Sequence, residues 1–324
     1  MRLLLIAALG WFISISADAA PPITAAAFSP DGNQVLIGSQ AGLELRNWPG
    51  LELHSRLKIE LSNIHDLAFS HAGDVLLIAG GAPGEDGVVE VWTWPDRVRL
   101  QQIKAHRDLV YRVAWSPDRG EFATAGADGI CQVFDAKTGK QRVRYAGHSR
   151  AVLALAYLPD GQSIVSAGVD QTLQLWNSST GEQLRTLDNH LSAVNDLAVR
   201  PGTKLSAPPV VVSVSDDRTV RLWQPTIGRL MRFAKLPSPP RCVAWSTDGL
   251  QIVVGCNDGR VRRIDPESVE VETIGQPLPG RIHQLLAAPH TQWLIGGDNG
   301  AWKSHPTGLR MADESFGAVE PFHD

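Results

Sequence analysis

Cysteine is scarce in this chain, since only three of its 324 residues are Cys. A small, odd number of cysteines argues against the disulfide framework that holds small secreted domains together. Cys131 stands alone, whereas Cys242 and Cys256 fall on neighbouring expected strands, where a bridge or two buried thiols would both fit. Because free cysteine packs well among apolar side chains, the sequence favours buried thiols.

An excess of charge is also missing, because 30 Lys and Arg residues face 34 Asp and Glu residues and leave a net charge of −4. Without a strongly basic field, we expect no nucleic-acid partner. The chain lacks a G-x-S-x-G turn, an H-E-x-x-H pair and a glycine loop with lysine that would hold phosphate. The sequence therefore predicts that the protein is not an enzyme and that it has no cofactor and no metal site.

Long apolar runs are absent except at the N-terminus, where Met1-Arg2 precedes the run LLLIAALGWFISIS and then Ala17-Asp18-Ala19. A basic start, a short apolar run and an A-x-A site are typical of a secretory signal peptide. We expect residues 1–19 to be removed and the protein to be exported, to the periplasm or the extracellular space, with no stable membrane span afterwards. The alternatives are a misassigned start or an uncleaved anchor, and without a signal the protein would be cytoplasmic.

Helical periodicity is missing from the rest of the chain, which instead repeats short strands around turns. Apolar runs end in Pro-Asp-Gly or related turns at 25–32, 153–161 and 243–249, and a second apolar run follows each, as in a β-hairpin. A turn position recurs about every 40 to 50 residues, a period typical of repeat architectures. These turn positions are Ala41, Asp86, Asp128, Asp170, Asp217, Asp258 and Asn299.

One repeat carries Gly147-His148, Ser166, Asp170 and Trp176-Asn177, and it matches the pattern of WD-repeat (WD40) proteins almost throughout. Residues 22–305 resemble this family. The resemblance implies an all-β fold, a seven-bladed β-propeller of four-stranded antiparallel blades, in one domain at 20–324. The expected repeats are 22–59, 60–103, 104–145, 146–187, 188–235, 236–276 and 277–313, followed by a tail at 314–324.

The resemblance also implies a buried hydrogen-bond chain of His, Ser or Thr, Asp and Trp in a repeat. The third to fifth repeats offer the residues for it: His106, Thr124, Asp128, His148, Ser166, Asp170, Trp176, His190, Ser213, Asp217 and Trp223. The first, sixth and seventh have no His in place, and the sixth ends in Ile264-Asp265 without a Trp. We therefore expect the middle repeats to be the rigid ones, and Asp170→Ala to destabilise far more than Asp258→Ala.

The N-terminus bears on how the expected ring closes, because the first inner strand begins by Ile23. The mature chain would then have no N-terminal strand to lend to the last repeat. We expect residues 308–324 to supply the missing outer strand.

Members of the family often bind partners on the face formed by the loops before the first strands and by the turns joining second and third strands. Carried onto this chain, that face would have an apolar sector and a charged sector. The expected partner-binding residues are Leu109, Tyr111, Ala151, Leu153 and Val169 in the first and Asp216, Arg241 and Arg281 in the second. The sequence thus predicts a non-catalytic scaffold for protein–protein interaction.

A propeller enzyme or a small-ligand or metal-binding protein that uses the central channel, as lactonases and quinoproteins do, is the alternative. It would require several His, Asp or Glu residues at the channel mouth. The candidates are His65, Glu85, His283 and Asp298.

Overall fold

The computed structural model describes residues 21–117, 120–202, 207–274, 278–288 and 293–303. The predicted signal peptide and the predicted closing segment at 308–324 lie outside these residues. No helix within the described ranges is long and apolar enough to cross a membrane.

The described residues form seven antiparallel sheets that follow one another along the chain. The first sheet contains β1 (Ile23–Phe28), β2 (Gln34–Ser39), β3 (Gly42–Asn47) and β4 (Leu53–Leu57), and the second β5 (Ile64–Phe69), β6 (Val75–Ala82), β7 (Asp86–Thr93) and β8 (Arg99–His106). The third contains β9 (Val110–Trp115), β10 (Glu121–Gly126), β11 (Cys131–Asp135) and β12 (Gln141–Tyr145), and the fourth β13 (Val152–Tyr157), β14 (Ser163–Gly168), β15 (Leu173–Asn177) and β16 (Gln183–Leu187). The fifth contains β17 (Val194–Val199), β18 (Val211–Ser215), β19 (Thr219–Gln224) and, after the short helix η1 (Pro225–Ile227), β20 (Arg229–Lys235). The sixth contains β21 (Pro240–Trp245), β22 (Ile252–Cys256), β23 (Val261–Ile264) and β24 (Val271–Ile274), and the last β25 (Ile282–Ala287), β26 (Trp293–Gly297) and β27 (Gly300–Lys303).

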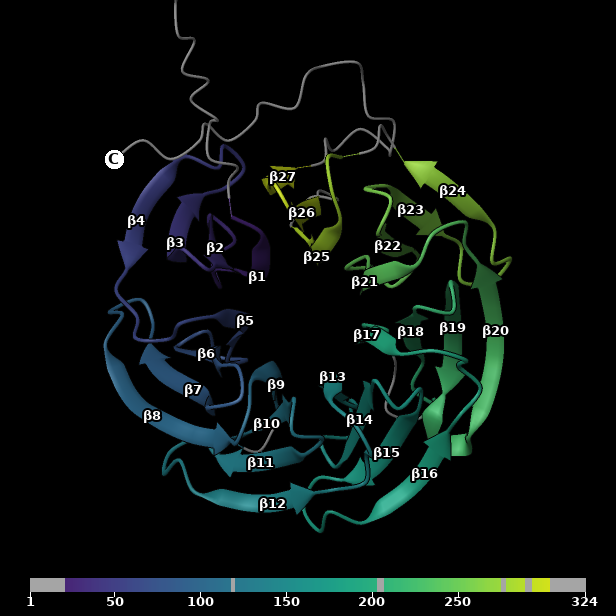
Figure 1. Cartoon of the computed structure of the whole chain (residues 1–324), viewed down its shortest axis with the longest axis horizontal. Helices are drawn as coiled ribbons and strands as arrows, with labels where there is room; N and C mark the ends of the chain where they lie inside the picture. Colours follow the sequence, from purple (N-terminus) through teal and green to yellow (C-terminus); the bar gives the residue numbers. More distant parts are fainter. Residues whose placement is uncertain (1–20, 118–119, 203–206, 275–277, 289–292, 304–324) are drawn as a thin grey trace, which may run out of the picture.

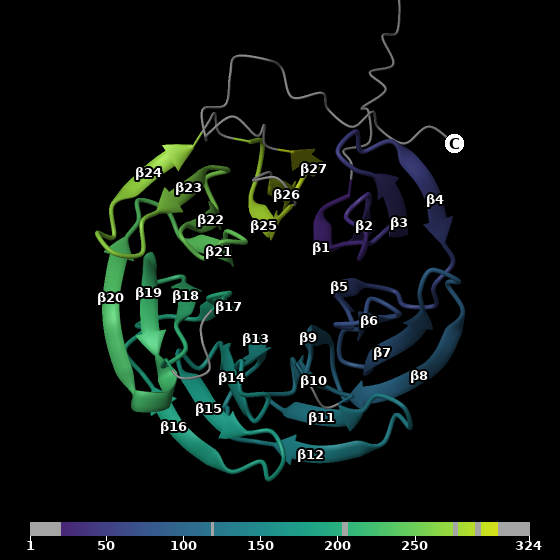
Figure 2. The same ribbon diagram turned by 180° about the vertical axis from the view of Figure 1, so that it is seen from behind.

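The sheets stand in a ring, with the first strand of each sheet at the centre and the fourth at the rim (Figures 1 and 2). Each inner strand contacts the inner strand of the next sheet, and β1 contacts β25 and β26, which closes the ring. The closing contact is apolar, since Ile23, Val35 and Leu294 belong to one buried cluster. The arrangement is an all-β propeller.

The seventh sheet differs from the other six, because it has three strands within the described residues whereas each of the others has four. The expectation of four-stranded antiparallel blades is therefore confirmed for six sheets. A fourth strand for the seventh sheet, expected from 308–324, lies outside the described residues.

The strands of one sheet differ in burial, and this explains why some of them are apolar throughout and others are polar. A second strand such as Ser163–Gly168 is buried along its whole length, because neighbouring sheets cover both of its faces. The rim strand Gln183–Leu187 of the same sheet is exposed at all but its last residue. Apolar clusters fill the space between consecutive sheets; Val133, Ile164 and Trp176 belong to one of them.

Every inner strand carries a register shift near its start. In β13, for example, Val152 pairs with Gly168 and Ala154 with Ala167, so Leu153 is the extra residue of a β-bulge. Bulges re-aim the side chain that they leave unpaired. The bulge residues are Thr24, His65, Tyr111, Leu153, Asn195, Arg241 and His283.

Candidate functional site

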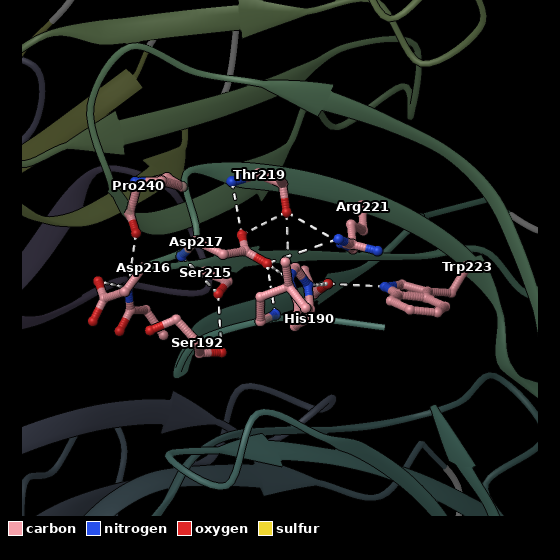
Figure 3. A network of polar contacts seen from close by, with 12 residues as sticks. His190, Ser192, Ser215, Asp216, Asp217, Thr219, Arg221, Trp223 and Pro240 are labelled. Carbon is pink, nitrogen blue, oxygen red and sulfur yellow. Dashed lines mark hydrogen bonds and ion pairs between the residues drawn. The ribbon is translucent and has the colours of Figure 1, made fainter. Parts of the chain in front are cut away.

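The predicted hydrogen-bond chain is present in the fifth sheet (Figure 3). His190 lies between a carboxylate and a hydroxyl: its Nδ1 is 2.9 Å from Asp217 Oδ2, and its Nε2 is 2.7 Å from Ser213 Oγ. Trp223 Nε1 donates to the same Ser213 Oγ at 2.8 Å. The Ser213 hydroxyl is fully buried, so each of these polar groups needs its partner inside the protein.

The fourth sheet repeats this geometry. His148 joins Asp170 at 2.9 Å to Ser166 at 2.8 Å, and Trp176 Nε1 donates to Ser166 Oγ at 3.1 Å. Because Ser166 is fully buried and already accepts from Trp176, it is no exposed nucleophile.

In the third sheet His106 joins Asp128 at 2.9 Å to Thr124 at 2.7 Å, and Phe134 replaces the Trp donor. The close approach depends on Gly126, since a Cβ there would lie 2.3 Å from His106 Nδ1. The sequence therefore predicted the residues of all three hydrogen-bond chains.

Burial and hydrogen bonding oppose each other at the carboxylates. Burial acts to raise the pKa of Asp217, but hydrogen bonds from Thr219, the Leu191 amide and His190 outweigh it and lower that pKa to about 2. Burial also lowers the pKa of His190, against the opposing effect of Asp217. The fifth sheet therefore holds an ionised carboxylate beside a neutral imidazole at neutral pH.

These carboxylates have a second role at the surface. Each accepts the backbone N–H of the residue after its His: Asp128 from Arg107 at 3.3 Å, Asp170 from Ser149 at 3.1 Å and Asp217 from Leu191 at 3.0 Å. The buried chain thus fixes the loops that lead into the inner strands. We call the face made by these loops and by the turns joining second and third strands the histidine face, and the opposite face the turn face.

The sixth and seventh sheets place other residues around the turn Asp. In the sixth, Asp258 receives two hydrogen bonds from Arg262, at 3.1 and 2.6 Å, and Arg262 is 3% exposed. In the seventh, Asp298 accepts from the Arg281 amide at 2.7 Å and lies 2.6 Å from His283 Nε2. The sequence predicted that these sheets have no His in place before the inner strand, but it did not predict that Arg262 or the strand residue His283 contacts the turn Asp.

Three of the predicted partner-binding residues, Tyr111, Leu153 and Arg241, occupy bulge positions on inner strands and are partly exposed. The Tyr111 ring lies edge-on to His65 with centroids 5.2 Å apart. Arg241 pairs with Asp216 at 3.6 Å, and Asp216 also accepts from Asn195 at 2.8 Å. Two of the three residues predicted for the charged sector, Asp216 and Arg241, are therefore in contact with each other.

The remaining predicted residues differ in exposure. Ala151 and Val169 are partly exposed and Arg281 is exposed. Leu109 is 8% exposed, so it presents little surface to a partner. In contrast, Leu191 is 79% exposed on the histidine face, and sequence reasoning did not select it. Its place directly after His190, where Arg107 and Ser149 stand in their repeats, was the signal that could have found it.

A group of charges in the channel was also not predicted. Arg112 on β9 forms an ion pair with Asp196 on β17 and lies 3.7 Å from Asp66 on β5, so it links three inner strands. Each carboxylate also accepts a backbone N–H from the following sheet: Asp66 from Val113 at 2.8 Å and Asp196 from Val243 at 3.0 Å. The recurrence of an Asp at the third position of β5 and β17 was the available sequence signal.

Burial has the largest effect on the pKa values of the two carboxylates. It raises the pKa of Asp66 to about 6 and that of Asp196 above its ordinary value, in both cases against the attraction of Arg112. Burial acts to lower the pKa of Arg112, but the two carboxylates outweigh it and raise that pKa.

The four residues proposed for a channel metal site do not come together as a set. His283 and Asp298 are in contact, whereas His65 packs on Tyr111 and Glu85 is exposed on the second sheet. In the described part of the chain, no group of three or more His, Cys, Asp and Glu residues could hold a metal ion. The three cysteines are free and buried, and Cys242 and Cys256 lie on the paired strands β21 and β22.

Comparison with known families agrees with the repeats. The sequence model described as "WD domain, G-beta repeat" matches residues 97–135, 139–177, 181–224 and 234–265. These four segments cover most of the third to sixth sheets.

Two relatives share a shorter stretch with the chain. An intraflagellar transport protein 122 homolog from Xenopus tropicalis is 38% identical over 76 residues, which is 24% of this chain and 6% of that protein. The homolog from Danio rerio is 37% identical over 76 residues, with the same coverage. The chain thus spans a small fraction of the length of these relatives.

Proposed function

Because the chain is a WD-repeat β-propeller protein, we propose that it is a non-catalytic scaffold that holds a protein partner on its histidine face. The observation that carries the proposal is that Asp carboxylates repeatedly hold the backbone of the loops on this face by hydrogen bonds. Arg107, Ser149 and Leu191 stand at equivalent surface positions three residues before an inner strand, and Arg281 directly precedes the last one. An Asp carboxylate accepts the backbone N–H of each. A surface whose backbone is already ordered loses less conformational entropy on binding.

The side chains on this face support the same function. Leu191 is largely exposed in the loop before β17, and Tyr111 on β9 and Leu153 on β13 are partly exposed. Apolar anchors surrounded by arginine have the composition of interface hot spots. The chemistry of the His-containing chains points away from catalysis, because the Ser166 and Ser213 hydroxyls are fully buried.

The names of the two relatives add modest support. Both are described as homologs of an intraflagellar transport protein, and the shared stretch is 6% of their length. We also propose that this protein acts after export.

The test is affinity capture with the full chain as bait. Tyr111→Glu with Leu153→Glu places two charges on the histidine face, and Val98→Glu with Leu184→Glu places two on exposed apolar positions near the rim, 56% and 45% exposed. Both variants must melt within a degree or two of the parent to be informative. We expect specific partners to be lost by the first variant and kept by the second. If both variants retain the partners equally, the histidine face is not the binding surface.

A second candidate function, binding of a small ligand in the channel, has one observation in its favour. A cavity of about 390 Å³ lies beside Arg112 and Asp196, with Trp245 and Gln284 in its wall. A ligand that binds only the folded state must raise the melting temperature. Melting in the presence of zinc, calcium and small organic acids therefore tests this candidate, and a rise that Gln284→Ala abolishes would bring it forward.

A further inference from the structure

Arginine on the histidine face is left without a carboxylate partner. Five exposed arginines stand on the loops and turns of this face, and within the described residues none of them forms an ion pair. They are Arg107, Arg150, Arg218, Arg260 and Arg281. They follow the ring from the third sheet to the seventh, since each belongs to a loop or turn of one of these sheets (Figure 1).

The carboxylates of the same sector are engaged elsewhere. Asp128, Asp170, Asp217 and Asp298 each contact a His, and Asp258 contacts Arg262. Three other carboxylates lie on this sector. Asp216 pairs with Arg241, Asp108 accepts from the Gly84 amide at 2.9 Å, and Asp188 is exposed. Among the exposed charged side chains of this sector, the five unpaired arginines therefore outnumber the carboxylates Asp188 and Asp258.

The turn face has the opposite character. Exposed carboxylates stand in its turns, and several of them accept local hydrogen bonds, as Asp31 does from Ser29 and Asp248 from Ser246. The exposed acidic residues of these turns are Asp31, Asp74, Asp96, Asp160, Asp248 and Asp265. Exposed carboxylates thus predominate on the turn face, and exposed arginines on the histidine face.

Leu191 and Arg218 are held next to each other by one buried group. Asp217 fixes the Leu191 amide, and Arg218 follows Asp217 in a turn where its φ is 64° and its N–H donates to Ser215 O at 3.0 Å. An exposed apolar side chain and an unpaired cation therefore stand on backbone that the network in Figure 3 keeps rigid.

We propose that the histidine face of the third to seventh sheets binds an acidic protein segment, whose carboxylates pair with the unpaired arginines while an apolar side chain packs on Leu191. This proposal rests on the scaffold function proposed above and names the chemistry of the partner. Complementary charge accelerates association and selects the partner, while the buried apolar contact supplies affinity. Arg is suited to the role, because its planar guanidinium binds carboxylates through two parallel hydrogen bonds.

A polypeptide fits the surface better than a nucleic acid. Nucleic-acid backbones are uniformly anionic, and the chain offers no basic field beyond this one sector. The exposed Leu191 has no use against phosphate, whereas an acidic peptide with an apolar residue uses both features.

The experiment measures binding of a short fluorescent peptide of alternating Glu and Leu by anisotropy. The probes beside it are the same peptide with Gln for Glu, the same peptide with Ser for Leu, and a thymidine oligonucleotide. The test variant is Arg107→Glu, Arg150→Glu, Arg218→Glu. The matched control is Lys140→Glu, Arg144→Glu, Arg229→Glu, which changes the net charge equally at exposed positions at or near the rim strands β12 and β20.

We expect the test variant to bind the Glu-Leu peptide at least about tenfold more weakly than the parent and the control to bind it normally. Leu191→Ser should weaken binding as well, and raising the salt from roughly 0.05 to 0.2 M should weaken the parent several-fold. Equal weakening in the control, or equal binding of the Gln peptide, would overturn the proposal. Tighter binding of the oligonucleotide would replace it with a nucleic-acid surface.

Self-association is the remaining outcome, since the two faces carry opposite charge. If sedimentation shows that the parent assembles through its histidine face and the test variant does not, the occupant is a second copy and the proposal fails. The scaffold function fails separately. If captured partners are lost on Tyr111→Glu with Leu153→Glu but kept by the arginine variant, the scaffold stands and the acidic partner is excluded.

Discussion

The third to fifth sheets pair a carboxylate in one way, and the first, second and sixth sheets pair one in another. In the former, Asp170 and its equivalents contact a His ring that is also bonded to a hydroxyl. In the latter, the partner is Arg: Glu44 with Arg46 at 2.8 Å, Glu90 with Arg99 at 2.9 Å, and Asp258 with Arg262 at 2.6 Å. The two chemistries also serve different positions, since Glu44 and Glu90 lie within third strands, whereas Asp170 and Asp258 lie in turns.

The two chemistries differ in what burial costs. Burying an ion pair desolvates two charges, and apolar residues of similar volume can often replace such a pair without loss. A His that bridges an Asp and a Ser belongs to a branched chain in which each member satisfies several others. We therefore expect the Arg pairs to be replaceable as pairs and the His chains not to be.

The largest effects test this difference directly. Asp258→Ala leaves the guanidinium of Arg262, 3% exposed, without its carboxylate and should cost about 3 kcal/mol, as for a broken buried pair. Asp170→Ala removes the acceptor of His148, Ser149 and Thr172 and should cost a similar amount, about 1 kcal/mol for each bond. The sequence alone favoured a mild effect for Asp258→Ala, because it did not place Arg262 beside Asp258.

Second substitutions separate the two cases in urea or guanidinium unfolding. Adding Arg262→Met to Asp258→Ala should recover most of the lost stability, because no buried charge is then left unpaired. Adding His148→Leu to Asp170→Ala should recover little, because the Ser166 hydroxyl proton then has no acceptor and the Ser149 amide still lacks its partner. If the Met variant loses stability further, the sixth sheet depends on its charges as firmly as the fourth depends on its His.

The pH dependence of stability should differ in sign between the His chains and the channel. Asp217 has a folded pKa near 2, below its unfolded value, so its contribution is present above about pH 4 and is lost as the pH falls toward 2. Asp66 has a folded pKa raised to about 6, so the stability that it contributes is full below about pH 4 and is lost as the pH rises through 6.

The shift at Asp66 corresponds to a change on the order of 2–3 kcal/mol across this range. The measurement is the free energy of unfolding as a function of pH, with Asp66→Asn and Asp217→Asn beside the parent. Asp66→Asn should flatten the curve between about pH 4 and 6, and Asp217→Asn should flatten it below pH 4. An unchanged slope in Asp66→Asn would mean that Arg112 holds this carboxylate ionised throughout.

The sequence predicted those parts of the molecule that repeat. The strands, their turns and the His-containing chains recur at a fixed spacing, so each copy supports the interpretation of the others. Arg112 with Asp66 and Asp196 could not be found this way, because the ion group joins one residue from each of three sheets and occurs once. The exposure of loop side chains could not be predicted either. Leu109 lies three residues after His106 and is 8% exposed, whereas Leu191 directly follows His190 and is 79% exposed.

The smallest expected effect lies within the His-containing sheets, where the third sheet has Phe134 in place of a Trp. Trp176 is fully buried, donates to Ser166 Oγ at 3.1 Å and stacks on Tyr145 with centroids 4.8 Å apart. Trp176→Phe removes the donor and leaves the Ser166 hydroxyl its bond to His148, so unfolding should become easier by about 1–2 kcal/mol.

The reverse change, Phe134→Trp, should not gain the same amount. Phe134 already stacks on Phe122 with centroids 5.4 Å apart, and a larger ring in this packed space strains its neighbours. If Trp176→Phe leaves the unfolding free energy unchanged, the indole donor adds nothing to the chain and the third and fourth sheets are equivalent. If Phe134→Trp stabilises the protein, the third sheet has room for an indole donor. The hydrogen-bond chain of the third sheet then contributes less stability than that of the fourth because it lacks this donor.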